Sequence, residues 1–210
     1  MKNRKEHLIT VAVSMRVDVI ESYGETRDAL DENLCRWLTK AGCLPVPVPN
    51  TLIEDNTLKA WFETISPDTI VLSGGNNIGD FKNRDETERF LLETSREKKI
   101  PLLGICRGMQ MMAVWAGEEL QPVEGHVRTR HKLASETDGF SMPESVNSYH
   151  DFGMMTVPEN FEVIARNDDG IIEAIGHKYL PMEGWMWHPE REKEFSSEDI
   201  ENLKRLIESR

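Results

Sequence analysis

The sequence is poor in cysteine and contains no CxxC pair. Its three cysteines, Cys35, Cys43 and Cys106, are odd in number and irregularly spaced. A disulfide framework or a cysteine-based zinc site needs paired cysteines at regular spacing. The set is more typical of a reducing compartment, and we therefore expect a cytoplasmic protein.

Long hydrophobic runs and an excess of basic residues are also missing. No apolar run approaches the roughly 18 residues that a membrane-spanning helix needs. The short apolar run near the N-terminus predicts a first strand rather than a signal peptide. The chain has 37 acidic and 25 basic residues, a formal net charge of −12. Nucleic acids and membranes are not expected as partners, because a general basic field is absent.

What the 210 residues do contain is an alternation of apolar, strand-like segments with amphipathic, helix-like segments. This alternation predicts a parallel sheet covered by helices on both faces, within a single domain over residues 1–210. The prolines of 44–49 favour an edge position for that strand. The expected strands are 8–14, 44–49, 68–75 and 100–106, and the expected helices are 26–42, 57–65, 86–99 and 197–210.

Cys106 lies where the strand-like "PLLGI" meets the helix-like "RGMQMMAVWAG". The pattern Gly104-x-Cys106-x-Gly108 is the cysteine form of a nucleophile elbow, in which small neighbours let the central residue adopt a strained turn. A helix N-terminus favours the thiolate, and the N–H of Arg107 can face an oxyanion. The pattern is short, however, and on its own it fits a buried structural thiol equally well.

A general base for Cys106 has to come from the six histidines. His188 follows an apolar run, and Glu190, two residues later, can orient its ring. His150 is the alternative base. His126 and His131 belong to a basic segment, "GHVRTRHK". We expect no metal site, because there is no HExxH motif and this closest histidine pair lacks a supporting carboxylate.

Four motifs occur together: "LSGGNNIGD", "GICRGMQ", "VNSYHDFG" and "WHPE". In this order, over about residues 11–190, they resemble class I glutamine amidotransferase domains. They resemble more closely the γ-glutamyl-γ-aminobutyrate hydrolases, also called peptidase C26. The resemblance implies a flavodoxin-like, doubly wound and mostly parallel sheet, no cofactor, and attack on a small γ-glutamyl substrate through a glutamyl-thioester.

The resemblance also implies roles for particular residues. The implied triad is Cys106, His188 and Glu190, and the implied oxyanion hole is formed by the backbone of Gly75 and Arg107. The implied contacts to the glutamyl portion of the substrate are Gly74, Gln110, Ser148, Tyr149 and His150.

The chain departs from typical γ-glutamyl-γ-aminobutyrate hydrolases in its shorter length and in the segment 14–34. That segment resembles a capsule-associated branch that includes γ-glutamyl-CDP-amidate hydrolase. Arg16 follows the carboxyl end of the first strand, where a ligand is expected, and arginine suits phosphate contacts. We hypothesise that Arg16 and some of Arg27, Arg128 and Arg130 face an anionic leaving group. Their alternative role is that of solvated surface charges.

Other functions stay open at this point. A glutaminase subunit that passes ammonia to a partner synthetase would need a second protein, and a homodimer is compatible with the sequence. A binding domain without catalysis is disfavoured by the intact Cys106, His188 and Glu190. Asp85 and Glu88 are expected to be first-turn helix acids that complement the helix dipole.

Overall fold

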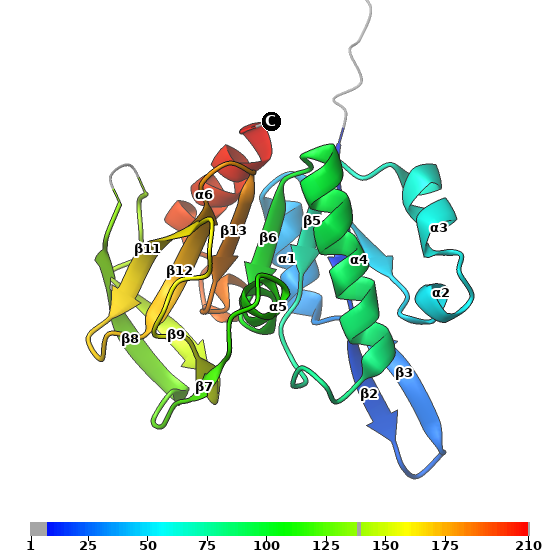
Figure 1. The fold of residues 1–210 in the computed structure, drawn as a ribbon, viewed down its shortest axis with the longest axis horizontal. Coiled ribbons are helices and arrows are strands. Elements are labelled where there is room, and N and C mark those ends of the chain that lie inside the picture. Colours follow the sequence, from blue (N-terminus) through cyan, green and yellow to red (C-terminus); the bar gives the residue numbers. More distant parts are fainter. Residues whose placement is uncertain (1–7, 138–139, 210) are drawn as a thin grey trace, which may run out of the picture.

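The computed structural model describes residues 8–137 and 140–209, so the basic residues 1–7 lie outside the described part. Its central feature is a nine-stranded sheet. The strands are β1 (Ile9–Ser14), β4 (Cys43–Val48), β5 (Thr69–Leu72), β6 (Leu102–Ile105), β8 (Val127–Ser135), β9 (Ser145–Tyr149), β11 (Phe161–Asn167), β12 (Ile172–His177) and β13 (Met182–Trp185). Their order is β4-β1-β5-β6-β13-β12-β11-β8-β9 (Figure 1). The first five pair in parallel, and the last four extend the sheet in antiparallel fashion.

Helices cover both faces of this sheet. The helices are α1 (Glu32–Lys40), α2 (Thr51–Glu54), α3 (Leu58–Ile65), α4 (Lys82–Lys98), α5 (Arg107–Trp115) and α6 (Ser197–Glu208). Apolar residues of α1 and α6 pack in one core cluster, and those of α3, α4 and α5 pack in another. Figure 1 shows α4 and α5 in front of the sheet, with α1 and α6 behind it. The structure confirms a single-domain, doubly wound α/β fold.

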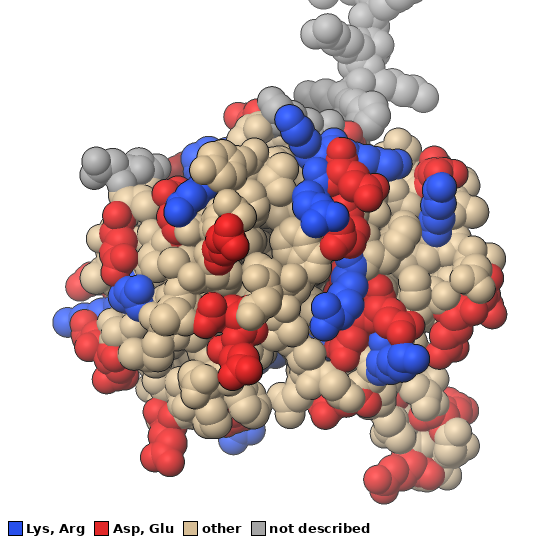
Figure 2. All heavy atoms as spheres, viewed as in Figure 1, with Lys and Arg blue, Asp and Glu red and all other residues tan. Residues whose placement is uncertain are grey.

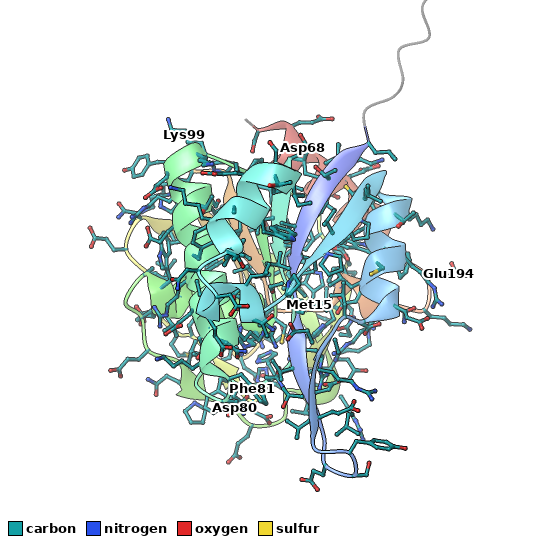
Figure 3. All side chains as sticks on the ribbon, turned by 90° about the vertical axis from the view of Figure 1, so that its right-hand side faces the viewer. Met15, Asp68, Asp80, Phe81, Lys99 and Glu194 are labelled. Atoms are coloured by element: carbon teal, nitrogen blue, oxygen red, sulfur yellow. The ribbon has the colours of Figure 1, made fainter. Side chains whose placement is uncertain are left out.

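Burial is complete in the central parallel strands β5 and β6. All four residues of β5 and all four of β6 are buried, as expected of strands covered on both faces. The proline-containing β4 pairs with β1 alone, and so the predicted edge position is confirmed. In Figure 3, Asp68 and Lys99, which precede β5 and β6, lie at one end of the molecule. Asp80 and Phe81, which precede α4, lie at the opposite end.

The expected helix over 26–42 is wrong in its first part. Residues 26–29 belong to β3 (Glu25–Ala29), which pairs with β2 (Arg16–Ile20) in an antiparallel hairpin. The helix begins only at Glu32, because the Asp31 side chain accepts a hydrogen bond from the Asn33 N–H at 2.8 Å and caps it. The hairpin projects from the body of the molecule (Figure 1).

Three smaller elements complete the structure. These are a two-stranded pairing of β7 (Gln121–Pro122) with β10 (Phe152–Gly153) and a short 3₁₀ helix, η1 (Pro189–Arg191). Acidic and basic side chains are interspersed on the face shown in Figure 2. Within residues 8–137 and 140–209, no helix has the length and apolar character that crossing a membrane requires.

Candidate active site

Cys106 occupies a sharp turn between β6 and α5. Its φ of 51° and ψ of −105° are strained for a residue with a side chain. A Cβ on Gly104 would lie 2.6 Å from the carbonyl carbon of Gly108, and one on Gly108 would lie 2.3 Å from the Leu72 oxygen. The turn therefore requires glycine on both sides of Cys106. Arg107 is the first residue of α5, so its N–H has no partner within the helix.

His188 and Glu190 form a buried pair beside Cys106. The His188 Nδ1 lies 2.6 Å from the Glu190 Oε1, and the two residues are only 1% and 3% exposed. Burial opposes a charge on His188. The charges of Cys106 and Glu190 and hydrogen bonds with both nevertheless raise the pKa of His188 from 6.5 to about 9. The ring is therefore protonated at neutral pH and lies between the Cys106 sulfur and the Glu190 carboxylate.

The backbone of His188 is held by Asn147, a residue that sequence reasoning missed. The Asn147 side chain donates to the His188 carbonyl at 2.8 Å and accepts from the His188 N–H at 3.1 Å. This amide is on β9, whereas His188 follows β13, four strands away in the sheet. The sequence carries no signal for such a long-range contact.

The glycine turn after β5 lies directly against the His188 ring. A Cβ on Gly74 would lie 2.6 Å from the His188 Cε1, so only glycine leaves room for the imidazole. Gly75 has a φ of 86°, a conformation that side chains disfavour. The backbone at 74–75 therefore lies close to the group that faces Cys106.

The Arg84 side chain hydrogen-bonds to the backbone of this turn. Its fully buried guanidinium donates to the carbonyl oxygens of Ser73 at 2.8 Å and Gly74 at 3.1 Å, and also to that of Gly75. Burial lowers the pKa of Arg84 to about 10, which leaves it charged at neutral pH, with Glu88 as its ion-pair partner at 3.1 Å.

Asp85 lies in the first turn of α4, as predicted, but the interpretation of Glu88 as a first-turn acid is wrong because Glu88 lies beyond that turn. Both carboxylates accept hydrogen bonds from the Arg107 guanidinium, and Glu88 is completely buried. Glu88 also accepts from the Ser14 hydroxyl at 2.9 Å. Arg107, next to the candidate nucleophile, is thereby joined through Glu88 to Arg84 and the glycine turn.

The predicted substrate contacts on β9 and directly after it lie in two different environments. The Tyr149 ring stands edge-on to the His188 ring with centroids 5.9 Å apart. The Ser148 hydroxyl instead donates to the His126 carbonyl at 2.6 Å, and the His150 Nδ1 lies 3.0 Å from the Phe152 carbonyl oxygen. Side chains alternate along a strand. Tyr149 therefore lies beside the catalytic candidates, whereas Ser148 and His150 contact the segment around His126.

The structure brings His150 together with His126, His131 and Glu173. The expectation that the histidine pair lacks a carboxylate is therefore wrong, since Glu173 comes from β12, far along the chain. The absence of a metal site stays a prediction, and this group is treated further below.

Gln110 lies one turn into α5 and borders an open pocket of about 420 Å³. Its side-chain amide donates to the Phe152 carbonyl at 2.9 Å, which leaves its oxygen available to a ligand. Asn77, Ile78 and Val114 line the same pocket.

Of the four predicted arginines, Arg16 lies at the site. It lines a small cleft with Gly74, His188 and Arg191. Arg191 was not predicted, although it directly follows Glu190 in the sequence. Its guanidinium lies 4.8 Å from the centre of the Tyr149 ring.

The other three arginines are exposed and do not line this cleft in the part of the chain that the structure describes. Arg27 pairs with Glu25 on the projecting hairpin, and Arg130 pairs with Glu192 at 3.0 Å. Arg128 has a φ of 58°.

The remaining cysteines lack such surroundings. Burial raises the pKa of the Cys43 thiol to about 11, and burial likewise raises that of Cys35. Both therefore remain thiols at neutral pH.

Comparison with known proteins agrees with this architecture. The chain matches the family Glutamine amidotransferase class-I over residues 24–205. It is 36% identical over 191 residues to gamma-glutamyl-CDP-amidate hydrolase of Campylobacter jejuni, covering 87% of this chain and 90% of the relative. It is 29% identical over 206 residues to gamma-glutamyl-gamma-aminobutyrate hydrolase of Escherichia coli O157:H7, covering 80% of each. A solved glutamine amidotransferase of Thermotoga maritima superposes with a TM-score of 0.66 at 19% identity, over 96% of this chain and 85% of that one. The chain belongs to the class I glutamine amidotransferase family.

Proposed function

We propose that the chain is a cysteine hydrolase that cleaves γ-glutamyl amides through a glutamyl-thioester. The observation that carries the proposal is the position of the His188 ring, which pairs with both Cys106 and Glu190. A nucleophile, a base and a residue that orients the base are the parts that covalent acyl transfer requires.

In the proposed reaction, the Cys106 Sγ attacks the γ-carbonyl carbon of the glutamyl group. The N–H groups of Arg107 and Gly75 stabilise the oxyanion that forms. His188 gives its proton to the leaving nitrogen, and the C–N bond breaks to leave a thioester. His188 then takes a proton from water, which attacks the thioester and releases glutamate. Glu190 keeps the imidazole oriented throughout.

The substrate that we propose is a γ-glutamyl nucleotide phosphoramidate of the γ-glutamyl-CDP-amidate type, used in surface polysaccharide biosynthesis. The similarity to the Campylobacter jejuni relative over nearly the whole of both chains supports it. So do Arg16 and Arg191, which line the cleft beside His188, because guanidinium groups bind phosphate oxygens in a fork-like geometry. Free Cys35, Cys43 and Cys106 fit a reducing compartment, and we place the reaction in the cytoplasm.

Glutamate release should be measured with glutamine, γ-glutamyl-γ-aminobutyrate and γ-glutamyl-CDP-amidate. We expect kcat/KM to be highest for the nucleotide amidate. Arg16→Ala should raise KM for that substrate and leave glutamine hydrolysis unchanged. Arg36→Ala is the matched control, since Arg36 is an exposed arginine on α1 that pairs with Glu32. An equal loss on both substrates in Arg16→Ala would overturn the assignment of the leaving group.

The family membership also favours a second function, that of a glutaminase that supplies ammonia to a separate synthetase. This function predicts slow hydrolysis of all three substrates by the isolated chain. It also predicts stimulation of glutamine hydrolysis by a second protein. Rapid turnover of a γ-glutamyl amide by the chain alone would exclude it.

A further inference from the structure

The strongest unexplained feature outside the catalytic candidates is a buried group of three histidines and one glutamate. His126 precedes β8, His131 is in β8, His150 follows β9 and Glu173 is in β12. One nitrogen or oxygen of each lies within 4.8 Å of those of the others. His126, His150 and Glu173 are at most 4% exposed, and the His131 side chain is 10% exposed.

In each residue of this group, one buried polar atom has no hydrogen-bond partner among the described residues. The orphaned atoms are His126 Nδ1, His131 Nε2, His150 Nε2 and Glu173 Oε2. A buried polar atom without a partner costs free energy, and four such atoms in one place are unusual. Their convergence indicates that a bound species satisfies them.

The distances within the group match the coordination shell of a metal ion better than hydrogen bonds. The Glu173 Oε1 lies 3.6 Å from His150 Nε2 and 3.8 Å from His131 Nε2. Both separations are too long for hydrogen bonds. Two ligands at about 2.0–2.1 Å from a tetrahedral Zn²⁺ lie about 3.3–3.4 Å apart, so small side-chain movements would complete the shell.

Neighbouring groups also orient two of these side chains, His150 and Glu173. The His150 Nδ1 lies 3.0 Å from the Phe152 carbonyl and carries the hydrogen there, so Nε2 presents its lone pair. Asn167 donates to the Glu173 Oε1 at 3.1 Å and orients that carboxylate.

We propose that His126, His131, His150 and Glu173 bind one Zn²⁺ ion in a closed, structural site. Imidazole and carboxylate suit zinc, and four protein ligands leave no position for a substrate. The site would join β8 and β12 to the end of β9. Because β9 also carries Asn147 and Tyr149, the ion would fix the strand that holds His188.

The test is the metal content of the full chain after purification without chelator and after incubation with Zn²⁺, measured by mass spectrometry. We expect about one zinc per chain in the wild type and a loss of zinc in His131→Ala and Glu173→Gln. His177→Ala is the matched control, because His177 is also in β12 but is not one of the four ligands, and it should retain zinc. Wild-type protein without zinc, before and after incubation, would overturn the proposal, as would equal zinc in all variants.

A second measurement covers variants that fail to fold. Wild-type protein stripped with dipicolinate should show a lower Tm, and added Zn²⁺ should restore it in a concentration-dependent way. Co²⁺ added in place of zinc should give the intense visible absorption of a tetrahedral site. A Tm that does not respond to zinc, or a weak octahedral cobalt spectrum, would contradict the closed site. These readouts do not depend on catalysis, so the proposal can fail while the proposed hydrolase function stands.

Discussion

Gly74 leaves no room for a side chain beside the His188 ring, and this gives a prediction for Gly74→Ala. The added Cβ would lie 2.6 Å from the His188 Cε1. Carbon atoms in ordinary contact are at least about 3.5 Å apart, so the ring has to retreat by about 0.9 Å. A misplacement of about 1 Å in a catalytic group costs roughly 10²-fold in rate. We therefore expect kcat for glutamate release to fall by about two orders of magnitude.

The same variant should fold normally. Gly74 does not have a positive φ, and the Arg84 bond to its carbonyl involves only the main chain. We expect an unchanged Tm together with slower alkylation of Cys106 by iodoacetamide, because His188 would have moved away from the thiol. Gly176→Ala is the control, since its Cβ would meet only the flexible end of Ile164, at 3.1 Å. A Gly74→Ala protein with wild-type kcat and alkylation rate would refute the reasoning.

Three further predictions concern the catalytic pair and its support. Wild-type protein should form an acid-stable glutamyl adduct with radiolabelled substrate, and Cys106→Ala should abolish it, whereas Glu190→Ala should keep a partial rate of glutamate release. Adduct formation without Cys106 would contradict the mechanism. Glu190→Gln should lower the His188 pKa from its value of about 9, as followed by NMR. Since that pKa is raised on folding, His188 contributes about 3 kcal/mol of stability that is complete below about pH 6.5 and lost as the pH rises through about 9. Urea unfolding at pH 6 and pH 10 measures this loss, and a flat profile would exclude it. Glu88→Gln should cost about 3–5 kcal/mol in urea unfolding because it leaves two buried guanidinium groups underpaired. Asp85→Asn should cost less, because Asp85 is 14% exposed; equal effects would count against the burial argument.

Much of the fold could be predicted because it depends on local patterns. Short apolar runs indicated the buried strands β5 and β6, and two flanking glycines indicated the turn at Cys106. The error at residues 26–29 has a local cause as well. Leucines at helical spacing extend the periodic pattern to residues before Asp31. Asp31 caps the helix, however, so the residues before it are not helical.

The parts of the site that could not be predicted depend on contacts between distant segments. Nothing local shows that the side chains of Arg84, Glu88 and Arg107 are buried together, so Glu88 was predicted only to complement the helix dipole. Asn147 hydrogen-bonds to His188 although β9 and β13 stand four positions apart in the order of the sheet. Glu173 lies about forty residues beyond His131 in the sequence, so spacing rules for metal ligands cannot include it.

Alternate residues on β9 and directly after it contact two different regions, the surroundings of His188 and the group of His126, His131, His150 and Glu173. Asn147 and Tyr149 contact His188. Ser148 hydrogen-bonds to the His126 carbonyl and His150 belongs to the histidine group, so the two sets are offset by one residue. A single-residue insertion or deletion within the strand would exchange the sets and disable both regions at once. Replacing two residues by two others, or changing the length of the loop before Ser145, keeps the phase. This strand should therefore tolerate changes of side chain in evolution far better than changes of length.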